Sequence, residues 1–394
     1  MSLLSASAVA YPFIKVDIVP PPAPTASRSP GVIAVVGKTD SGAPGGTAPV
    51  NAPREVTSAA DAVDLFAKRN AGGAPVHTAL SASLVLALQQ DPRPAKIYGV
   101  RVDGDDYAAA LVALEAVDDV TFVSLASEVA IDPLLALKAH VENTSADGSK
   151  RIGVAMVDPA RARSQTWAAE TLTALTGAGK VLRSDASRMI VVAGRAASAA
   201  TAPDFATAAM ASIAGRDPHI SPVLKQIRGV PIPRELQFSP SEIKDLSKEG
   251  IIPIIDPELI PGEGQYMAEG VLFTADANRP YVDIVRVLDD LEFRLRAGLI
   301  GSVGDARITR PGLTLVKATA EGILGPLKRR EVIDDFSVTI PLLERLAIPE
   351  AARTPADVNE ITNARATRGV DMIVVVVYGP QIHQLGVKLR MVFA

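Results

Sequence analysis

Short apolar runs that suit buried strands alternate with helical patterns along the first half of the chain, and this alternation constrains the fold most strongly. The runs that predict strands are Ser29–Gly37, Ala95–Val102, Val120–Leu125, Arg151–Val157 and Arg188–Ala193. The helical patterns between them are Leu80, Leu84 and Leu88 at four-residue steps, and the segments Tyr107–Val117, Pro133–His140 and Ser164–Leu175. Strands that alternate with helices form largely parallel sheets covered on both faces. The sequence therefore predicts an α/β domain with a covered mixed sheet.

A capped helix and a short strand begin after residue 238. Ser239 and Glu242 have the spacing of a capping box, in which each side chain accepts a hydrogen bond from the other residue's backbone N–H. The helix is expected to end at Lys248, and Ile251–Ile255 follows as a buried strand. Pro253 lacks a backbone donor, which predicts an edge strand or a bulge.

The rest of the second half mixes helices and strands. An amphipathic helix is predicted around residues 284–298, with one apolar face formed by Ile284, Val287, Leu288, Leu291 and Leu295. Further on we expect a helix at Leu313–Leu324, a strand near Asp335–Ile340 and a helix from Pro355. These elements predict an α+β C-terminal domain, so that the chain is α+β overall.

Both ends of the chain have strand-like patterns that are set apart by proline or glycine. Near the N-terminus a prolyl tract follows an alternating strand, and near the C-terminus Gly386 precedes a second one. The residues on the apolar faces of these strands are Ile14, Val16 and Ile18, and Val387, Leu389, Met391 and Phe393. Before the second of these strands, the segment Met372–Val377 is apolar on both sides. It is expected to be a central strand that includes Val374 and Val376.

Several motifs occur in the order found in one family of assembly proteins. They are Pro30-Gly31-Val32 at the first strand, Ser221-Pro222 followed by Ile227-Arg228-Gly229-Val230, and Tyr281–Arg286 at the start of the long helix. This order resembles contractile tail sheath proteins of bacteriophage tails, R-type pyocins and related injection systems. The resemblance covers the first 70 residues and roughly residues 205–394. Many family members have a Trp-Gly-Ala-Arg-Thr-type hairpin where this chain has Met267-Ala268-Glu269-Gly270-Val271.

The resemblance implies a structural protein rather than an enzyme. Copies would stack as hexameric rings around an inner tube, and the lattice would contract to drive the tube through a target envelope. The implied partners are other copies of the chain, the inner tube protein, and baseplate and tail terminator proteins. The implied location is a virion tail or an assembled injection particle, made in the bacterial cytoplasm.

The same resemblance suggests a division into four segments. These are an N-terminal arm with an exchanged strand at 1–29, an α/β domain with the outer variable region at 30–238, a conserved C-terminal sheath core at 239–379, and a C-terminal arm strand at 380–394. The two arms would add strands beside Met372–Val377 of another subunit.

Other function classes find little support in the sequence. The chain has no cysteine and four histidines, so neither thiol catalysis nor a structural zinc site is expected. The net charge of -4 argues against a nucleic-acid-binding surface, and no apolar run approaches the roughly 18 residues of a membrane span. Gly37-Lys38-Thr39 lacks the glycine spacing of a phosphate-binding loop. No catalytic, cofactor-binding or metal-binding residues are predicted.

Three further features allow more than one interpretation. The acidic turn Asp103–Asp106 suits a solvated helix cap better than a cation site. His77, His140, His219 and His383 have no partner motif and are expected to be ordinary structural residues. Lys328, Arg329 and Arg330 follow Gly325-Pro326 and form either a solvated turn or a contact to an acidic tube.

Two alternatives to a sheath subunit remain open at this point. One is an α/β enzyme with a C-terminal oligomerisation domain, which a clustered polar pocket in the α/β region would favour. The other is a non-contractile capsid or scaffold component, which would share the strand arms.

Overall fold

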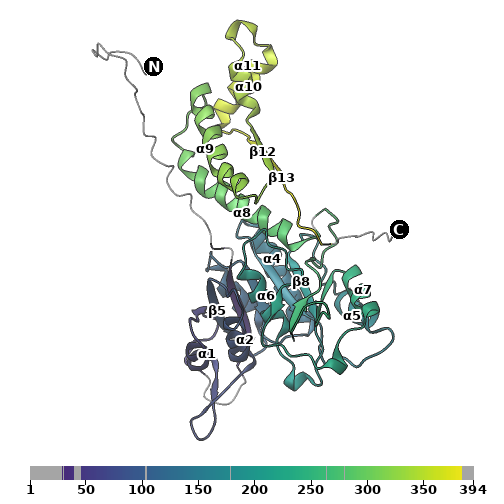
Figure 1. Ribbon diagram of the computed structural model, residues 1–394. Coiled ribbons are helices and arrows are strands. Elements are labelled where there is room, and N and C mark those ends of the chain that lie inside the picture. Colours follow the sequence, from purple (N-terminus) through teal and green to yellow (C-terminus); the bar gives the residue numbers. More distant parts are fainter. Residues whose placement is uncertain are drawn as a thin grey trace, which may run out of the picture. The chain divides into compact units, whose positions relative to one another are not determined.

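The computed structural model describes residues 29, 31–39, 46–102, 104–177, 179–262, 264–278 and 280–383. The chain divides into two compact units (Figure 1). We call Ser27–Phe293, Val332–Asp335 and Val377–Ala394 the sheet unit, and Met1–Ala26, Arg294–Glu331 and Phe336–Val376 the helical unit. The arm residues Ile14, Val16, Ile18, Val387, Leu389, Met391 and Phe393 lie outside the described residues.

A nine-stranded sheet forms the centre of the sheet unit, in the order β2-β5-β1-β6-β7-β8-β10-β11-β9. The six strands from β5 to β10 are parallel, and β2, β11 and β9 pair antiparallel at the two sides. This confirms the predicted mixed, largely parallel sheet. The strands are β1 (Val32–Lys38), β2 (Arg54–Glu55), β5 (Lys96–Val102), β6 (Phe122–Leu125), β7 (Ile152–Met156), β8 (Met189–Ala193), β9 (Gln226–Ile227), β10 (Ile251–Ile255) and β11 (Gln265–Met267).

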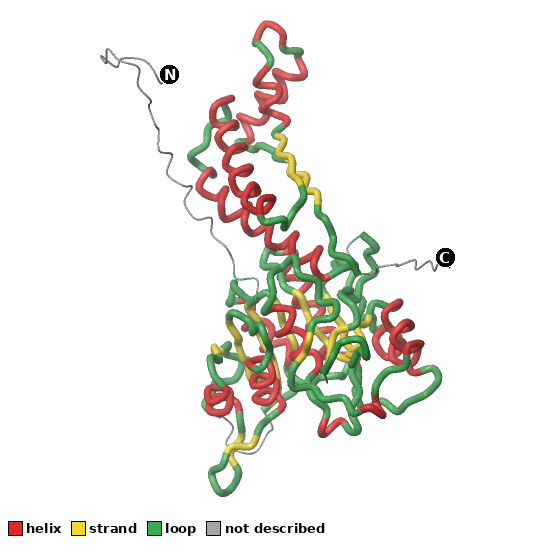
Figure 2. The backbone as a smooth tube through the Cα atoms, viewed as in Figure 1, coloured by secondary structure: helices red, strands yellow, loops and turns green. Residues whose placement is uncertain are grey.

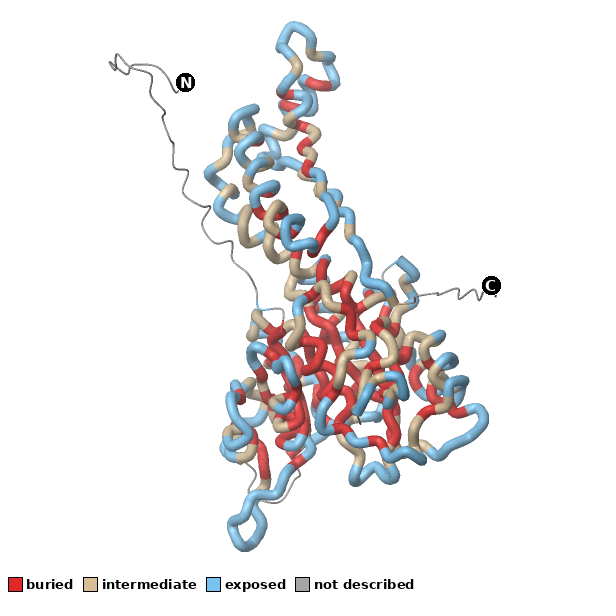
Figure 3. Tube along the Cα trace, in the orientation of Figure 1, coloured by how far each residue is buried: buried red, intermediate tan, exposed pale blue. Residues whose placement is uncertain are grey.

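Helices cover both faces of this sheet, as predicted. Alternate residues of β1 show why: Ile33 and Val35 pack into one apolar cluster, whereas Val32, Ala34 and Val36 pack into the other. The central strands β1, β6, β7 and β8 are accordingly buried along nearly their whole lengths, and buried residues fill the middle of the sheet unit in Figure 3. The first face carries α1 (Ala59–Phe66), α2 (Ala79–Leu88) and α6 (Phe205–Ala214), and the second carries α3 (Tyr107–Glu115), α4 (Ile131–Ala146), α5 (Trp167–Thr176) and α7 (Pro240–Lys248).

Short elements complete the sheet unit. A separate hairpin pairs β3 with β4 antiparallel, and two 3-10 turns lie in the connections. Their bounds are β3 (Lys68–Arg69), β4 (Pro75–Val76), η1 (Ala199–Thr201) and η2 (Arg234–Leu236). None of the helices described in the chain has the length and apolar character that a membrane span requires.

The predicted capping box of α7 is present and is tied to the other helices of its face. Ser239 N–H donates to Glu242 Oε2 at 2.9 Å, and Ser239 Oγ accepts from Glu242 N–H at 3.4 Å. Arg195 donates to Glu242 Oε1 at 2.7 Å, and its guanidinium lies 4.4 Å from the ring centres of both Trp167 and Phe238. Burial acts to raise the pKa of Glu242, but hydrogen bonds from Arg195 and Ser239 outweigh it and lower the pKa to about 2.

The prediction that Pro253 places its strand at an edge or a bulge is wrong. β10 lies inside the sheet, with β8 on one side and β11 on the other. The carbonyl oxygen of Pro253 accepts from Ala268 N–H at 2.9 Å, and Ala268 comes directly after the end of β11. Because the N and the carbonyl of a strand residue face the same neighbour, the missing N–H of Pro253 faces Ala268, just past the end of β11, and costs the ladder one bond at its terminus.

The buried face of the long helix also differs from the prediction. This helix, α8 (Val282–Leu299), begins in the sheet unit and continues into the helical unit. Leu288, expected in the apolar face, is 47% exposed, whereas Asp283 and Arg286 are buried. Val287 and Leu291 are buried as predicted, but polar side chains at three-residue steps along α8 also bind the sheet unit, so the apolar pattern located only part of its buried face.

Among its described residues, the helical unit consists of the end of α8 and seven further elements. Its small apolar cluster contains Leu313, Ile340, Leu342, Leu346 and Ile361. Most of its residues are exposed or half-buried (Figure 3). The elements are η3 (Ile300–Ser302), α9 (Arg310–Arg329), β12 (Asp335–Thr339), α10 (Pro341–Ala347), η4 (Glu350–Ala352), α11 (Pro355–Thr367) and β13 (Ile373–Val377), of which β12 and β13 form a two-stranded sheet.

The compact units do not divide where the sequence segments were expected to divide. β10 and β11 belong to the nine-stranded sheet, so the sheet unit extends past residue 239 to Phe293. The segment boundary at 239 concerns the pattern of a family, whereas these units are defined by contacts within one chain. The four-segment division therefore stays a prediction.

Candidate assembly surfaces

β13 presents a row of exposed apolar side chains. Ile373, Val375 and Val377 are 52%, 54% and 51% exposed, and Val374 and Val376 on the alternate positions are half-buried. Within the described residues β13 pairs with β12 alone (Figure 2). No second neighbour or covering layer of β13 is present among those residues, so its expected place as a central strand stays a prediction.

This exposure makes β13 the leading candidate for an interface. A strand that is rich in β-branched residues and has one paired edge offers its other edge for strand addition. Two-stranded sheets are marginally stable in water by themselves. Five consecutive apolar residues, Ile373–Val377, on such a sheet make this surface a candidate interface.

The basic triplet lies at the end of a helix and not in the turn that Gly325-Pro326 had suggested. α9 continues through Pro326, Lys328 and Arg329 form its last turn, and Arg330 is the C-cap. All three basic residues are exposed. Positive charge at this position favours the helix, because the carbonyl end of a helix carries partial negative charge. A structural role is thus sufficient to explain the triplet, and a contact to a tube stays a prediction.

The remaining motifs are used inside the fold. Gly37 lies where a Cβ atom would come within 2.6 Å of Ala126 Cβ, so close packing requires glycine there. Lys38 pairs with Asp105 at 2.5 Å, and Asp106 Oδ1 accepts from Ala109 N–H at 3.1 Å to cap α3. The expectation of a helix-capping turn is confirmed for the described residues of that turn.

The histidines occupy separate places. His140 is buried and accepts a hydrogen bond from Arg151, His77 lies 3.3 Å from Ser81 Oγ, and His383 lies 2.9 Å from Ser221 Oγ. Burial, with the nearby charge of Arg151, lowers the pKa of His140 to about 4. No cluster of three or more potential metal-ligating side chains occurs within the residues described.

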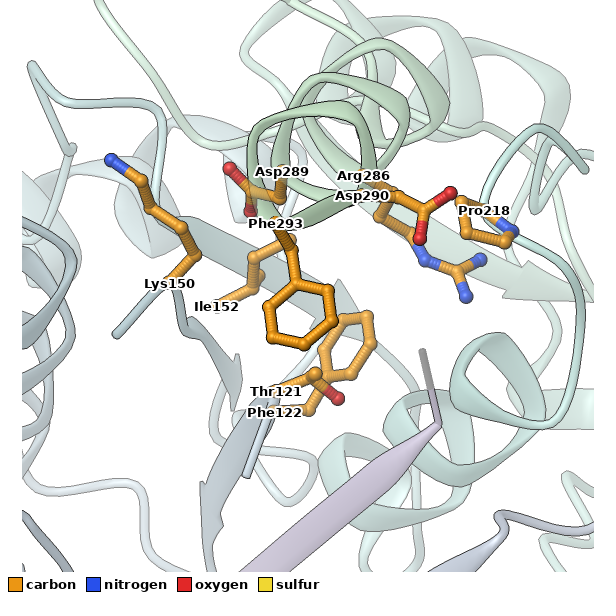
Figure 4. A pocket seen from close by; sticks show the side chains of 9 residues that line it. All are labelled: Thr121, Phe122, Lys150, Ile152, Pro218, Arg286, Asp289, Asp290 and Phe293. Carbon is orange, nitrogen blue, oxygen red and sulfur yellow. The ribbon is translucent and has the colours of Figure 1, made fainter. Parts of the chain in front are cut away.

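A small pocket of about 40 Å³ lies beside α8 in the sheet unit (Figure 4). Arg286 at its side is buried and donates to the carbonyl oxygens of Arg216 at 2.6 Å and Asp217 at 3.2 Å. Burial lowers the pKa of Arg286 to about 10. Asp289 is held by Arg188, and Phe122 and Phe293 form an apolar wall. These charged groups already bind other parts of the protein, which points to a structural role for them.

Comparison with known proteins identifies the fold. No protein-family model matches the sequence, and no curated protein matches it. Solved structures do match. One is the sheath complex of an extracellular contractile injection system, PVC, in its contracted state, with a TM-score of 0.67, 13% identity and coverage of 98% of each chain. Another is the contracted helical sheath of the anti-feeding prophage, with a TM-score of 0.63, 14% identity and coverage of 98% of this chain and 99% of that one.

A third similar structure comes from a bacterium. The crystal structure of a sheath tail protein from Desulfitobacterium hafniense matches with a TM-score of 0.58, 11% identity and coverage of 84% of this chain and 93% of that one. The first two similarities extend over 98% of this chain, so they include both the sheet unit and the helical unit. The fold of this chain is thus that of contractile sheath subunits.

Proposed function

We propose that this protein is a structural sheath subunit of a contractile tail or injection particle. The observation that carries the proposal is the end-to-end likeness to two sheaths in the contracted state, which covers 98% of this chain in each case. A likeness limited to the nine-stranded sheet would suit many α/β proteins, since one fold serves many functions. Here the helical unit is part of the likeness as well.

In this proposal subunits assemble as stacked hexameric rings around an inner tube. Contraction of the lattice drives the tube through a target envelope, and baseplate and tail terminator proteins bind the two ends. The energy of contraction comes from contacts between subunits, without nucleotide hydrolysis. The particle is a virion tail or an injection device, and its subunits are made in the cytoplasm of a bacterium.

Strand exchange would hold the lattice together. The N-terminal arm of one subunit, through Ile14, Val16 and Ile18, and the C-terminal arm of another would extend the β12–β13 sheet of a third. The exposed row on β13 supports this step, because an added strand would place its apolar side chains beside Val374 and Val376 on one face and beside Ile373, Val375 and Val377 on the other. Each ladder hydrogen bond contributes about 1 kcal/mol, and burial of the apolar side chains adds to it.

Electron microscopy of the purified protein tests the proposal directly. A sheath subunit forms hollow tubes with sixfold rings, alone or when the tube protein is added. Dispersed small oligomers under all conditions would argue against a sheath, and closed shells would favour a capsid component.

A further inference from the structure

The chain that follows β13 is fastened to the sheet unit by a set of specific side-chain contacts. Gln381 Oε1 accepts from Ser221 N–H at 2.9 Å, and Gln381 Nε2 donates to the carbonyl oxygen of His219 at 2.9 Å. The imidazole of His383 lies 2.9 Å from Ser221 Oγ and packs edge-on against Tyr281, with ring centres 5.0 Å apart. Ser221, which contacts both side chains, is 2% exposed.

The start of the same segment is fastened too. Tyr378 OH donates to Asp283 Oδ2 at 2.7 Å, and Asp283 is buried at the beginning of α8. Burial, followed by the hydrogen bond to Asp283, raises the pKa of Tyr378, so the hydroxyl stays a donor at physiological pH. Gly379 lies against Asp334, where a Cβ atom would come within 2.6 Å of Oδ2. The residue between the two polar anchors, Ile382, is 79% exposed.

These contacts lie at a mechanically important place in the chain. β13 ends at Val377, the fastened segment is Tyr378–His383, and the predicted arm strand Val387–Phe393 comes after it. A pull on the arm reaches Tyr378–His383 before it reaches β13. Without the contacts the pull would act on the end of β13, whose ladder with β12 would open one hydrogen bond at a time.

We propose that Tyr378–His383 is a clasp that transmits tension on the C-terminal arm to the sheet unit and so protects the β12–β13 pair from being peeled apart. The source of that tension, a neighbouring subunit, rests on the proposed function. The clasp itself rests only on contacts within the sheet unit. Its polar contacts suit this task, because hydrogen bonds of defined geometry fix the segment at one place, whereas an apolar surface would allow it to slide.

The first test measures the clasp in the dispersed full-length protein by hydrogen exchange. The variants are Gln381→Ala, His383→Ala and the double variant, and the matched control is Ile382→Ala, which removes an exposed side chain from the same segment. Loss of the acceptor should accelerate exchange of the Ser221 amide by about tenfold or more, with an unchanged melting transition. Equal exchange in the double variant and the Ile382→Ala control would overturn the clasp.

The second test measures tension in assembled tubes. Exchange of the β13 amides should be faster in tubes of the double variant than in tubes of the wild type or of Ile382→Ala. If the β13 amides exchange at the same rate in tubes of the double variant and of the wild type, the clasp does not transmit tension to the sheet unit. If the wild type forms no tubes at all, the sheath function fails, whereas the Ser221 amide in the dispersed protein still decides whether the clasp exists.

Discussion

Arg188 and Asp289 face each other in a bidentate ion pair that joins the start of β8 to the middle of α8. Arg188 Nη1 donates to Asp289 Oδ2 at 2.5 Å, and Nη2 donates to Oδ1 at 2.9 Å. Their side chains are 7% and 19% exposed. The two residues are 101 positions apart in sequence, and the pair contributes to holding α8 on the sheet unit.

Substitution of Asp289 by alanine should destabilise the sheet unit strongly. The change leaves the guanidinium of Arg188 buried without its counter-charge, which costs about 3–5 kcal/mol for a buried pair. Urea unfolding of the full chain measures the effect. The control is Asp64→Ala, which breaks the exposed Arg69–Asp64 pair and should change the free energy of unfolding by less than about 1 kcal/mol. Equal losses in both variants would contradict the assignment.

Acid should destabilise the protein through His140. Arg151 can only donate, so Nε2 of His140 must accept at their 2.9 Å contact and the ring must be neutral. Burial and then Arg151 lower the pKa of His140 to about 4, whereas the unfolded chain takes up this proton near pH 6.5. Between these pH values the unfolded state binds more protons, so stability decreases as the pH falls, by up to about 3 kcal/mol.

The control for that prediction is His140→Gln, whose amide oxygen retains an acceptor for Arg151 without titrating. Urea unfolding at pH 7 and pH 4.5 should show a larger acid loss in the wild type than in the variant. Glu115, the carboxylate nearest to the imidazole at 3.7 Å, is unchanged in both proteins. Identical pH dependence in the two proteins would remove His140 as the cause.

A charge on the exposed row of β13 should block assembly and leave the fold intact. Val375 is 54% exposed, so Val375→Lys costs little in the dispersed chain, but an interface would have to bury the ammonium group. Light scattering and electron microscopy should show loss of tubes with an unchanged melting transition. Val112→Lys, at a valine of α3 that is 62% exposed, is the control for added charge. Tubes of normal yield from Val375→Lys would rule out β13 as an interface.

Deletion of residues 1–19 should abolish polymerisation while both units stay folded. The arm's alternating strand lies in the deleted segment, which is outside the described residues. The absence of native cysteines permits a second test, in which cysteines at Ile14, Val16 or Ile18 are combined with cysteines at Val387, Leu389 or Met391. Oxidation should give intermolecular ladders. Crosslinks confined to one chain, or tubes from the truncated protein, would refute strand exchange.

Charge reversal of Lys328, Arg329 and Arg330 to glutamate should weaken co-assembly with the tube protein. The loss should be greatest at low salt, where screening of surface charges is least. Part of any effect will come from the helix itself, because acidic residues in the last turn oppose the helix dipole. Far-ultraviolet circular dichroism separates this contribution. Co-assembly that is independent of both charge and salt would leave the triplet with its structural role alone.

Local signals in the sequence predicted much of the fold. Each apolar run of the first half became a strand of the large sheet, because a parallel strand buried on both faces needs an uninterrupted apolar sequence. The N-cap at Ser239 was also predicted correctly, since a capping box depends on residues only three positions apart. The chain order of sheath-like motifs agreed with the structural likeness at low sequence identity.

Features that depend on distant partners were missed. Asp283 and Arg286 are polar residues of α8 that the apolar pattern assigned to solvent. Asp283 instead accepts a hydrogen bond from Tyr378, 95 positions away in sequence, and Arg286 donates to the carbonyl oxygen of Arg216, 70 positions away. The prediction of a turn at Gly325-Pro326 is wrong, because α9 continues through these residues. Gln381 and His383 gave no signal, since their partner Ser221 lies 160 positions earlier. Periodicity detects which residues are apolar, and only the tertiary structure decides which polar residues find buried partners.

The position of β10 in the sheet also determines when the edge of β8 can be paired during translation. β10 follows β8 in space but leaves the ribosome roughly 60 residues later, about 3–12 s at translation rates of about 5–20 residues per second. During that interval the edge of β8 that later pairs with β10 has no partner strand. A nascent chain at this stage exposes an unpaired strand edge, which can aggregate with other chains. The nearest such chains are those that other ribosomes are translating from the same messenger RNA. We therefore expect slow translation between residues 193 and 251 to lower the yield of this protein, and chaperones that bind this stretch to raise it.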